Sequence, residues 1–168
     1  KENFEKAISI SPEDCNIVLD YSNFLNSIGK KRLSLQQISN LTRNNKADYR
    51  LFYLQGCIQM DLKNYEDSIK SFKNVLQMKP DHKDASFNLG VIHFETKKYD
   101  LAEKIFDTYL KSFGKDVEAH RYLLQIFLIT NQINKADALS SMLCVNYPNE
   151  AFLLYERARV LTLSLIHI

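Results

Sequence analysis

A spacing of 34 residues recurs along this chain and limits what it can fold into. Pro12, Pro80 and Pro148 follow one another at twice this spacing, and Gly56 and Gly90 are separated by it once. The same spacing relates Tyr65 to Tyr99, Phe72 to Phe106, and Ser68 to Ala102 and Ala136. A fixed period of about 20–50 residues is typical of stacked supersecondary units, so a repeat architecture is predicted.

One register divides the chain into four units, which are residues 15–48, 49–82, 83–116 and 117–150. Residues 1–14 are interpreted as the second half of an earlier unit, and residues 151–162 as the first helix of a further one. Residues 163–168 break the pattern and resemble the translation of a transposase-type sequencing adapter. We interpret them as an artefact of that kind, with a genuine apolar helix end as the alternative.

Each unit fits two antiparallel helices. In residues 83–116, apolar side chains recur at helical spacing on both sides of the polar segment Thr96–Lys98, which predicts a turn. Between units, Pro80 ends one helix because proline cannot continue it, and Asp81 or Asp84 is predicted to cap the next helix. The predicted helices are residues 3–10, 15–28, 33–44, 49–62, 66–78, 83–96, 100–112, 117–130, 134–146 and 151–162.

Composition excludes several classes of protein. The 168 residues include only 4 glycines and 3 prolines, too few for a many-stranded sandwich, and 19 Phe and Tyr side chains argue against disorder. The net charge of +2 gives no strong field for nucleic acid. No apolar run is long enough to span a membrane. The three cysteines show no paired spacing, which favours free thiols and predicts a cytoplasmic location.

The register and its residues resemble the tetratricopeptide repeat (TPR) family, whose pattern of Leu-Gly, Tyr, Ala, aromatic and Pro covers about 34 residues. The resemblance covers residues 3–162, with unit 15–48 the poorest match and Leu124 in place of a glycine. The residues that match its packing positions are Gly56, Ser68, Phe72, Pro80, Leu89, Gly90, Ala102, Phe106, Ala136 and Pro148.

The resemblance implies an all-α fold, a right-handed α-solenoid of antiparallel helix pairs whose first helices line a concave groove. Aromatic and amide side chains on those helices could bind an extended peptide. Packing of the rings against neighbouring helices is the alternative. The candidate groove residues are Asn23, Arg50, Tyr53, Leu54, Phe87, Asn88, Val91, Arg121, Tyr122 and Gln125.

Two recognition schemes of the family are not expected here. A carboxylate clamp for chaperone C-termini needs several Lys, Arg and Asn residues on three successive inner helices. Starting from unit 15–48 only Asn23 matches, and starting one unit later only Asn88 does. An asparagine ladder needs one Asn in each unit, and Asn88 alone meets that requirement.

No catalytic, cofactor or metal motif stands out. His93 and Glu95 resemble the beginning of a deaminase zinc motif, but the cysteine pair that should follow is missing. Cys57 lies among inner-face positions without a basic neighbour and is interpreted as a buried hydrophobic residue. A non-catalytic scaffold for protein or peptide partners, with no cofactor, is therefore the leading hypothesis. The alternative is the substrate-recognition arm of a larger enzyme, such as a glycosyltransferase or a sulfotransferase. RNA binding is disfavoured by the near-neutral charge.

Overall fold

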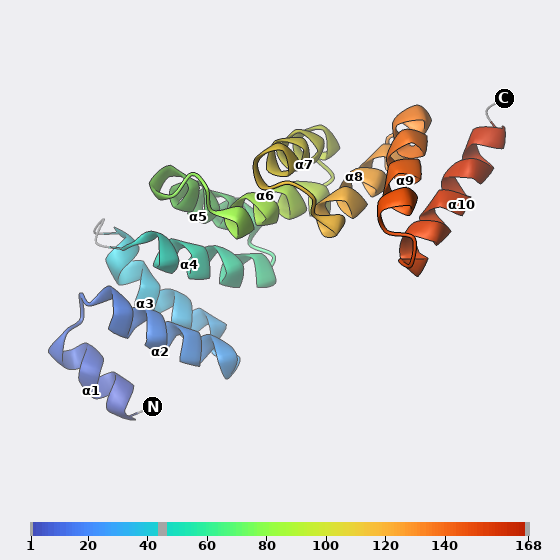
Figure 1. The fold of residues 1–168 in the computed structure, drawn as a ribbon. Coiled ribbons are helices and arrows are strands. Elements are labelled where there is room, and N and C mark those ends of the chain that lie inside the picture. Colours follow the sequence, from blue (N-terminus) through green and yellow to red (C-terminus); the bar gives the residue numbers. More distant parts are fainter. Residues whose placement is uncertain (1, 44–46, 167–168) are drawn as a thin grey trace. The chain divides into compact units, whose positions relative to one another are not determined.

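The computed structural model describes residues 2–43 and 47–166, and these ranges form ten helices and no strand (Figure 1). Their bounds are α1 Glu2–Ile10, α2 Cys15–Ser27, α3 Lys31–Arg43, α4 Tyr49–Asp61, α5 Tyr65–Met78, α6 Lys83–Glu95, α7 Tyr99–Phe113, α8 Val117–Ile129, α9 Ile133–Asn146 and α10 Ala151–Ile166. All ten predicted helices are present, with ends that differ from the prediction by up to two residues, and α10 continues four residues beyond residue 162. Residue 44, where the third predicted helix ends, and residues 167–168 of the suspected adapter segment lie outside the described residues.

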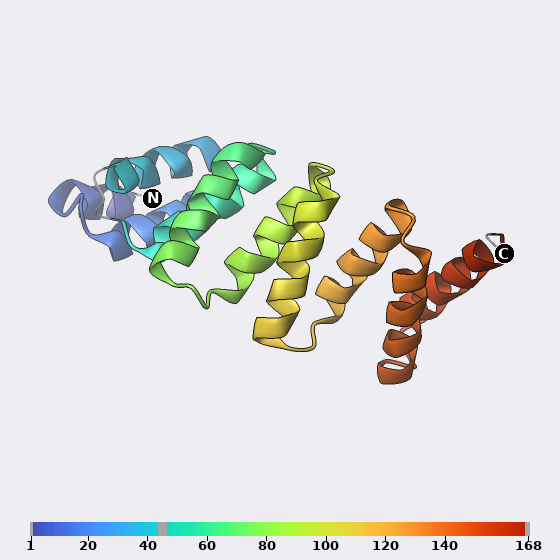
Figure 2. The ribbon, with the colours of Figure 1, turned by 90° about the horizontal axis from the view of Figure 1, so that it is seen from above.

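The chain divides into two compact units, residues 1–92 and 93–168, and the division falls within α6. In the first unit, α2 packs on α3, α3 on α4 and α4 on α5. In the second unit, α7 packs on α8, α8 on α9 and α9 on α10. Figure 2 shows successive helices of each unit running in opposite directions. The chain is thus an all-α helical repeat solenoid.

The turn inside each pair has the same backbone geometry, with a left-handed residue every 34 positions. Gly29, Lys63, Lys97 and Asn131 have φ values of 76°, 59°, 58° and 57°. In each turn the next N–H bonds back to a carbonyl five residues earlier, at 2.7–2.8 Å. This Schellman arrangement satisfies carbonyl groups at the helix end. A glycine at the turn is favoured for its φ, and lysine at the same position is strained.

Most first helices begin at an aspartate cap. The side chains of Asp14, Asp48 and Asp116 each accept two backbone N–H bonds from the first turn. The predicted caps of α6, Asp81 and Asp84, are wrong. Because α6 begins at Lys83, its cap position is residue 82, where Nδ1 of His82 accepts the N–H of Ala85 at 3.2 Å.

Small residues allow α4 and α5 to approach closely. A Cβ added to Gly56 would lie 2.7 Å from the ring of Phe72, so no side chain fits there. The hydroxyl of Ser68 donates to the carbonyl of Gly56 at 2.7 Å. Ser34 donates to the carbonyl of Ser22 at 2.8 Å, at the equivalent positions of α3 and α2. The small positions therefore join the two helices of a pair through a buried hydrogen bond.

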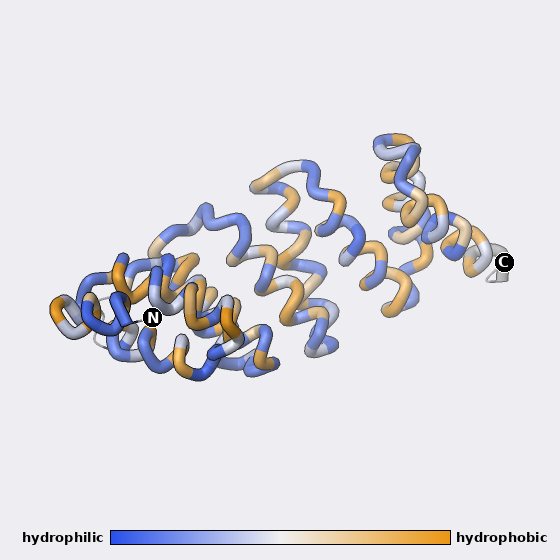
Figure 3. Tube along the Cα trace, turned by 90° about the horizontal axis from the view of Figure 1, so that it is seen from below, coloured by the Kyte–Doolittle hydropathy of each residue, from blue (hydrophilic) through white to orange (hydrophobic). Residues whose placement is uncertain are grey.

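Apolar side chains from successive helices form the core of each unit. Figure 3 shows hydrophobic and hydrophilic residues interspersed along the helical trace. In the second unit, Phe106 and Tyr109 are buried, and the Tyr109 hydroxyl donates to Asp116 at 2.7 Å. The core of the first unit consists of Val18, Ile38, Leu41, Ala47, Leu51, Leu54 and Ile58.

Ion pairs also join helices that are not partners in one pair. Lys31 at the start of α3 contacts Asp61 at the end of α4 at 2.8 Å. In the second unit, Glu103 on α7 accepts from Lys135 at 2.8 Å and from Gln132 at 3.0 Å. Partial burial opposes ionisation of Glu103, but these hydrogen bonds outweigh it and lower the pKa of the carboxyl.

Candidate binding surface

Tyr53 on α4 is the centre of the candidate surface in the first unit. Its half-buried ring lies 5.9 Å from the ring of Phe72 and 4.8 Å from that of His82. The side chains of Cys57 and Asn88 lie near its hydroxyl and affect its ionisation. Residues from α4 and α6, together with the segment between α5 and α6, are thus brought together around one aromatic ring.

Burial controls the ionisation of this group. Burial raises the pKa of Tyr53, and the nearby Cys57 and Asp84 raise it further. The pKa of the Cys57 thiol is also raised, chiefly by burial. A thiol must lose its proton to become a nucleophile, so this environment does not activate Cys57.

Arg50 joins two successive first helices. Its guanidinium bonds to the carboxylate of Asp48 at 2.9 Å and to the side chain of Asn16 on α2 at 2.9 Å. Hydrogen bonding and the charge of Asp48 raise the pKa of Arg50. Since this cation is already paired, it adds little positive charge to the surface.

Tyr122 on α8 is the centre of the candidate surface in the second unit. Its ring stacks on Phe106, with centroids 5.0 Å apart, and meets Phe94 edge-on at 5.1 Å. Arg121 beside it pairs with Glu118 at 2.7 Å and lies over the ring of Phe152, 4.0 Å from its centroid. A hollow of about 170 Å³ opens here, lined by Phe94, Glu95, Glu118, Arg121, Tyr122 and Gln125.

The remaining predicted groove residues differ in exposure. Asn23 is exposed, and Phe87 and Asn88 are half-buried. Leu54 and Val91 are only 8% and 7% exposed, so they belong to the core more than to a binding surface. Eight predicted packing residues are buried, namely Gly56, Ser68, Phe72, Leu89, Gly90, Ala102, Phe106 and Ala136, while Pro80 and Pro148 lie exposed in the connections.

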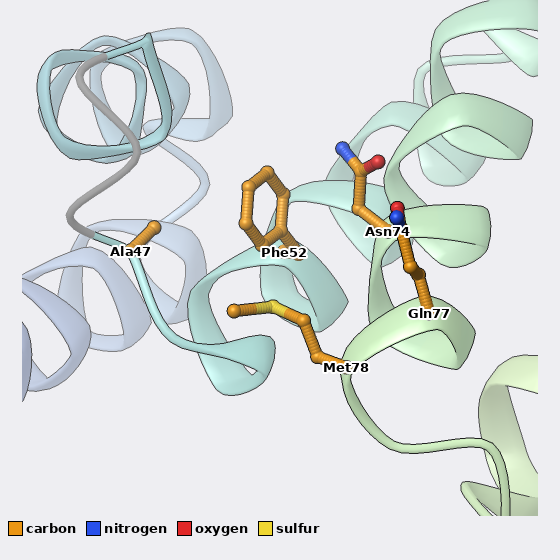
Figure 4. A pocket seen from close by; sticks show the side chains of 5 residues that line it. All are labelled: Ala47, Phe52, Asn74, Gln77 and Met78. Carbon is orange, nitrogen blue, oxygen red and sulfur yellow. The ribbon is translucent and has the colours of Figure 1, made fainter.

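A second hollow, of about 270 Å³, lies beside α4 and α5. Phe52 and Met78 face the same space from these helices, with Asn74 and Gln77 on the α5 side and Ala47 across from them (Figure 4). The sequence analysis did not identify it. The 53% exposure of Met78 at the end of an amphipathic helix is its clearest sign, and this is visible only in the structure.

The histidines have structural contacts. His82 caps α6, and Nδ1 of His120 lies 2.7 Å from the carbonyl oxygen of Asp116. Among residues 2–43 and 47–166, no three His, Cys, Asp or Glu side chains are grouped so that they could hold a metal ion. Within the same residues, no helix is both long and apolar enough to cross a membrane.

Residues 53–117 match the family model of the tetratricopeptide repeat. A TPR protein from Parabacteroides merdae superposes with a TM-score of 0.80 and 17% identity, over 95% of this chain and 63% of that one. This chain therefore spans less than two thirds of that protein. YrrB, described as a TPR protein with an unusual peptide-binding site, superposes with a TM-score of 0.79 and 17% identity, over 96% of this chain and 83% of that one. MamA superposes with a TM-score of 0.75 and 12% identity, over 81% of this chain and 80% of that one. No protein of curated function matches the chain in sequence.

Proposed function

We propose that this chain, a tetratricopeptide repeat protein, is a non-catalytic scaffold that binds a peptide or protein partner along its first helices. The observation that supports this best is that each unit holds a half-buried aromatic ring together with an amide side chain, at different positions of the repeat. In the first unit it is Tyr53 with Asn88, and in the second it is Tyr122 with Gln125.

These two groups suit an extended peptide. Each ring is held from one side by a buried phenylalanine, Phe72 or Phe106, so little side-chain entropy is lost when a partner covers it. An amide side chain both donates and accepts, as the peptide backbone requires. The Gln125 amide forms no hydrogen bond within the residues that the structure describes, which leaves it available to a partner.

The test compares amides on first and second helices. The rings are poor targets because their packing supports the fold, so Asn88→Ala and Gln125→Ala are combined instead. The control combines Gln36→Ala and Asn40→Ala, two exposed amides on the second helix α3. Proteins captured from a lysate by each immobilised variant are quantified by mass spectrometry, and circular dichroism confirms that helicity is unchanged.

Partners of the unmodified chain should be retained about tenfold less by the first-helix variant, a loss of about 1.4 kcal/mol. The control should retain them fully. Equal retention by both variants would contradict binding along the first helices.

A further inference from the structure

The hollow beside Tyr122 combines aromatic walls with carboxylates. Phe94 and Glu95 come from the last turn of α6, and Glu118, Tyr122 and Gln125 come from α8. The two rings meet edge-on at 5.1 Å, so they form a rigid apolar wall. The hollow has a volume of about 170 Å³.

Its charges do not cancel. The cation of Arg121 is already compensated by Glu118 at 2.7 Å and held over the ring of Phe152. Glu95 is exposed and forms no ion pair within the described residues, although Lys97 and Lys98 follow it in the turn. The lining therefore carries one carboxylate more than it has cations.

Both carboxylates act on the same hydroxyl. Burial raises the pKa of Tyr122, and the charges of Glu95 and then Glu118 raise it further, while Arg121 opposes them. Glu95, Glu118 and Tyr122 all line this one hollow. A cation placed there would meet the carboxylate of Glu95, a hydroxyl oxygen and the aromatic rings, all of which attract positive charge.

We infer that this hollow receives the ammonium or guanidinium group of a lysine or arginine in the partner peptide. The inference rests on the proposed function and names the chemistry of that partner. The aromatic wall contacts the methylene stem, and the carboxylate of Glu95 contacts the charged end. The preference is opposite in sign to that of a carboxylate clamp, which selects an acidic terminus.

The experiment uses the 168-residue chain and three capped peptides of one Gly-Ser-Ala sequence. Their central residue is lysine, norleucine or glutamate, so they differ at one side chain, which is positive, neutral or negative. Amide shift changes in ¹⁵N-labelled protein measure each affinity. The lysine peptide should bind about fivefold more tightly than the norleucine peptide, and the preference should fall as salt is added.

Glu95→Gln should remove most of the lysine preference. Glu66→Gln makes the same change of charge at an exposed position of α5 and should leave the preference intact. Equal affinities for the three peptides, tightest binding of the glutamate peptide, or no binding at millimolar concentration would each overturn the inference. The capture experiment above judges the scaffold separately, because it does not depend on the charge of Glu95.

Discussion

The pairs α4–α5 and α8–α9 occupy the same register but fill their interiors differently. In α4–α5, Gly56 makes room for the ring of Phe72. At the equivalent positions of α8–α9, Leu124 and Ser140 are both buried, so the large residue has moved to the other helix. The serine also leaves room for Arg157 of α10, which donates to its hydroxyl at 3.1 Å. The repeat thus preserves the volume of the interior rather than the residue at each position.

Giving α4–α5 the residues that α8–α9 has at these two positions should have the largest effect on stability. Phe72→Ser removes a fully buried ring and should cost about 4 kcal/mol of unfolding free energy, and Gly56→Leu alone should cost a similar amount through overpacking. The double variant should regain about 2 kcal/mol, because the new leucine fills the space that the ring leaves. Urea unfolding followed by circular dichroism measures all three. Simple addition of the two losses would show that volume is not exchanged between the helices.

A substitution by alanine should affect stability differently at Gly56, which is packed against Phe72, and at the equivalent position of α2, Ser22. Gly56→Ala should cost about 1–2 kcal/mol, since the clash with Phe72 exceeds the gain in helix propensity. Ser22→Ala is the matched control at the same position of α2. It should stabilise by about 0.5 kcal/mol, because its buried hydroxyl oxygen has no partner within the described residues. Thermal unfolding of both variants tests this, and a neutral Gly56→Ala would refute the close approach.

The turns offer a third contrast. Lys63 lies two residues after the end of α4 and Asn131 two residues after the end of α8, and both have a positive φ. Lys63→Gly should stabilise by about 0.7 kcal/mol by relieving backbone strain, and Asn131→Gly by only about 0.3 kcal/mol, since asparagine tolerates this conformation. Chemical denaturation of the two variants gives both values. The idea fails if the asparagine position gains as much as the lysine position.

The smallest expected effect concerns the caps of α4 and α8. Partial burial of Asp48 opposes its ionisation, but hydrogen bonds from Arg50 and the backbone prevail and lower the pKa below 3.8. The folded value lies below the unfolded one, so the ionised carboxylate stabilises the fold above about pH 4. That contribution is lost as the pH falls through the folded pKa. Asp48→Asn should therefore be slightly less stable than the unmodified chain at pH 7.

That difference should disappear in strong acid. Asp116, the cap of α8, has Tyr109 as its partner, whereas Glu118 stands where α4 has Arg50. Asp116→Asn is therefore the comparison variant. Unfolding curves at pH 7, 5 and 3 measure both. A constant difference between Asp48→Asn and the unmodified chain at all three values would exclude the linkage.

Sequence reasoning predicted the features that depend on local chemistry. Helix spans, the turn at Thr96–Lys98 and the small residues Gly56 and Ser68 follow from periodicity and side-chain size. It missed features that depend on contacts in space. His82 caps α6 because of where the helix begins, and Leu54 and Val91 are covered by neighbouring side chains. The hollow beside Tyr122 is formed by side chains from two helices, α6 and α8, so the periodicity of a single helix does not reveal it.

The packed helices within each unit are all close neighbours along the chain, with α2 and α4 the widest-spaced pair described. No strand or long crossover connects distant segments of the described residues. A duplication or deletion of 34 residues would therefore leave the remaining contacts in place, as long as whole pairs are gained or lost. An array built in this way can change its length in evolution by whole 34-residue repeats, while each hollow keeps the chemistry of its own helices.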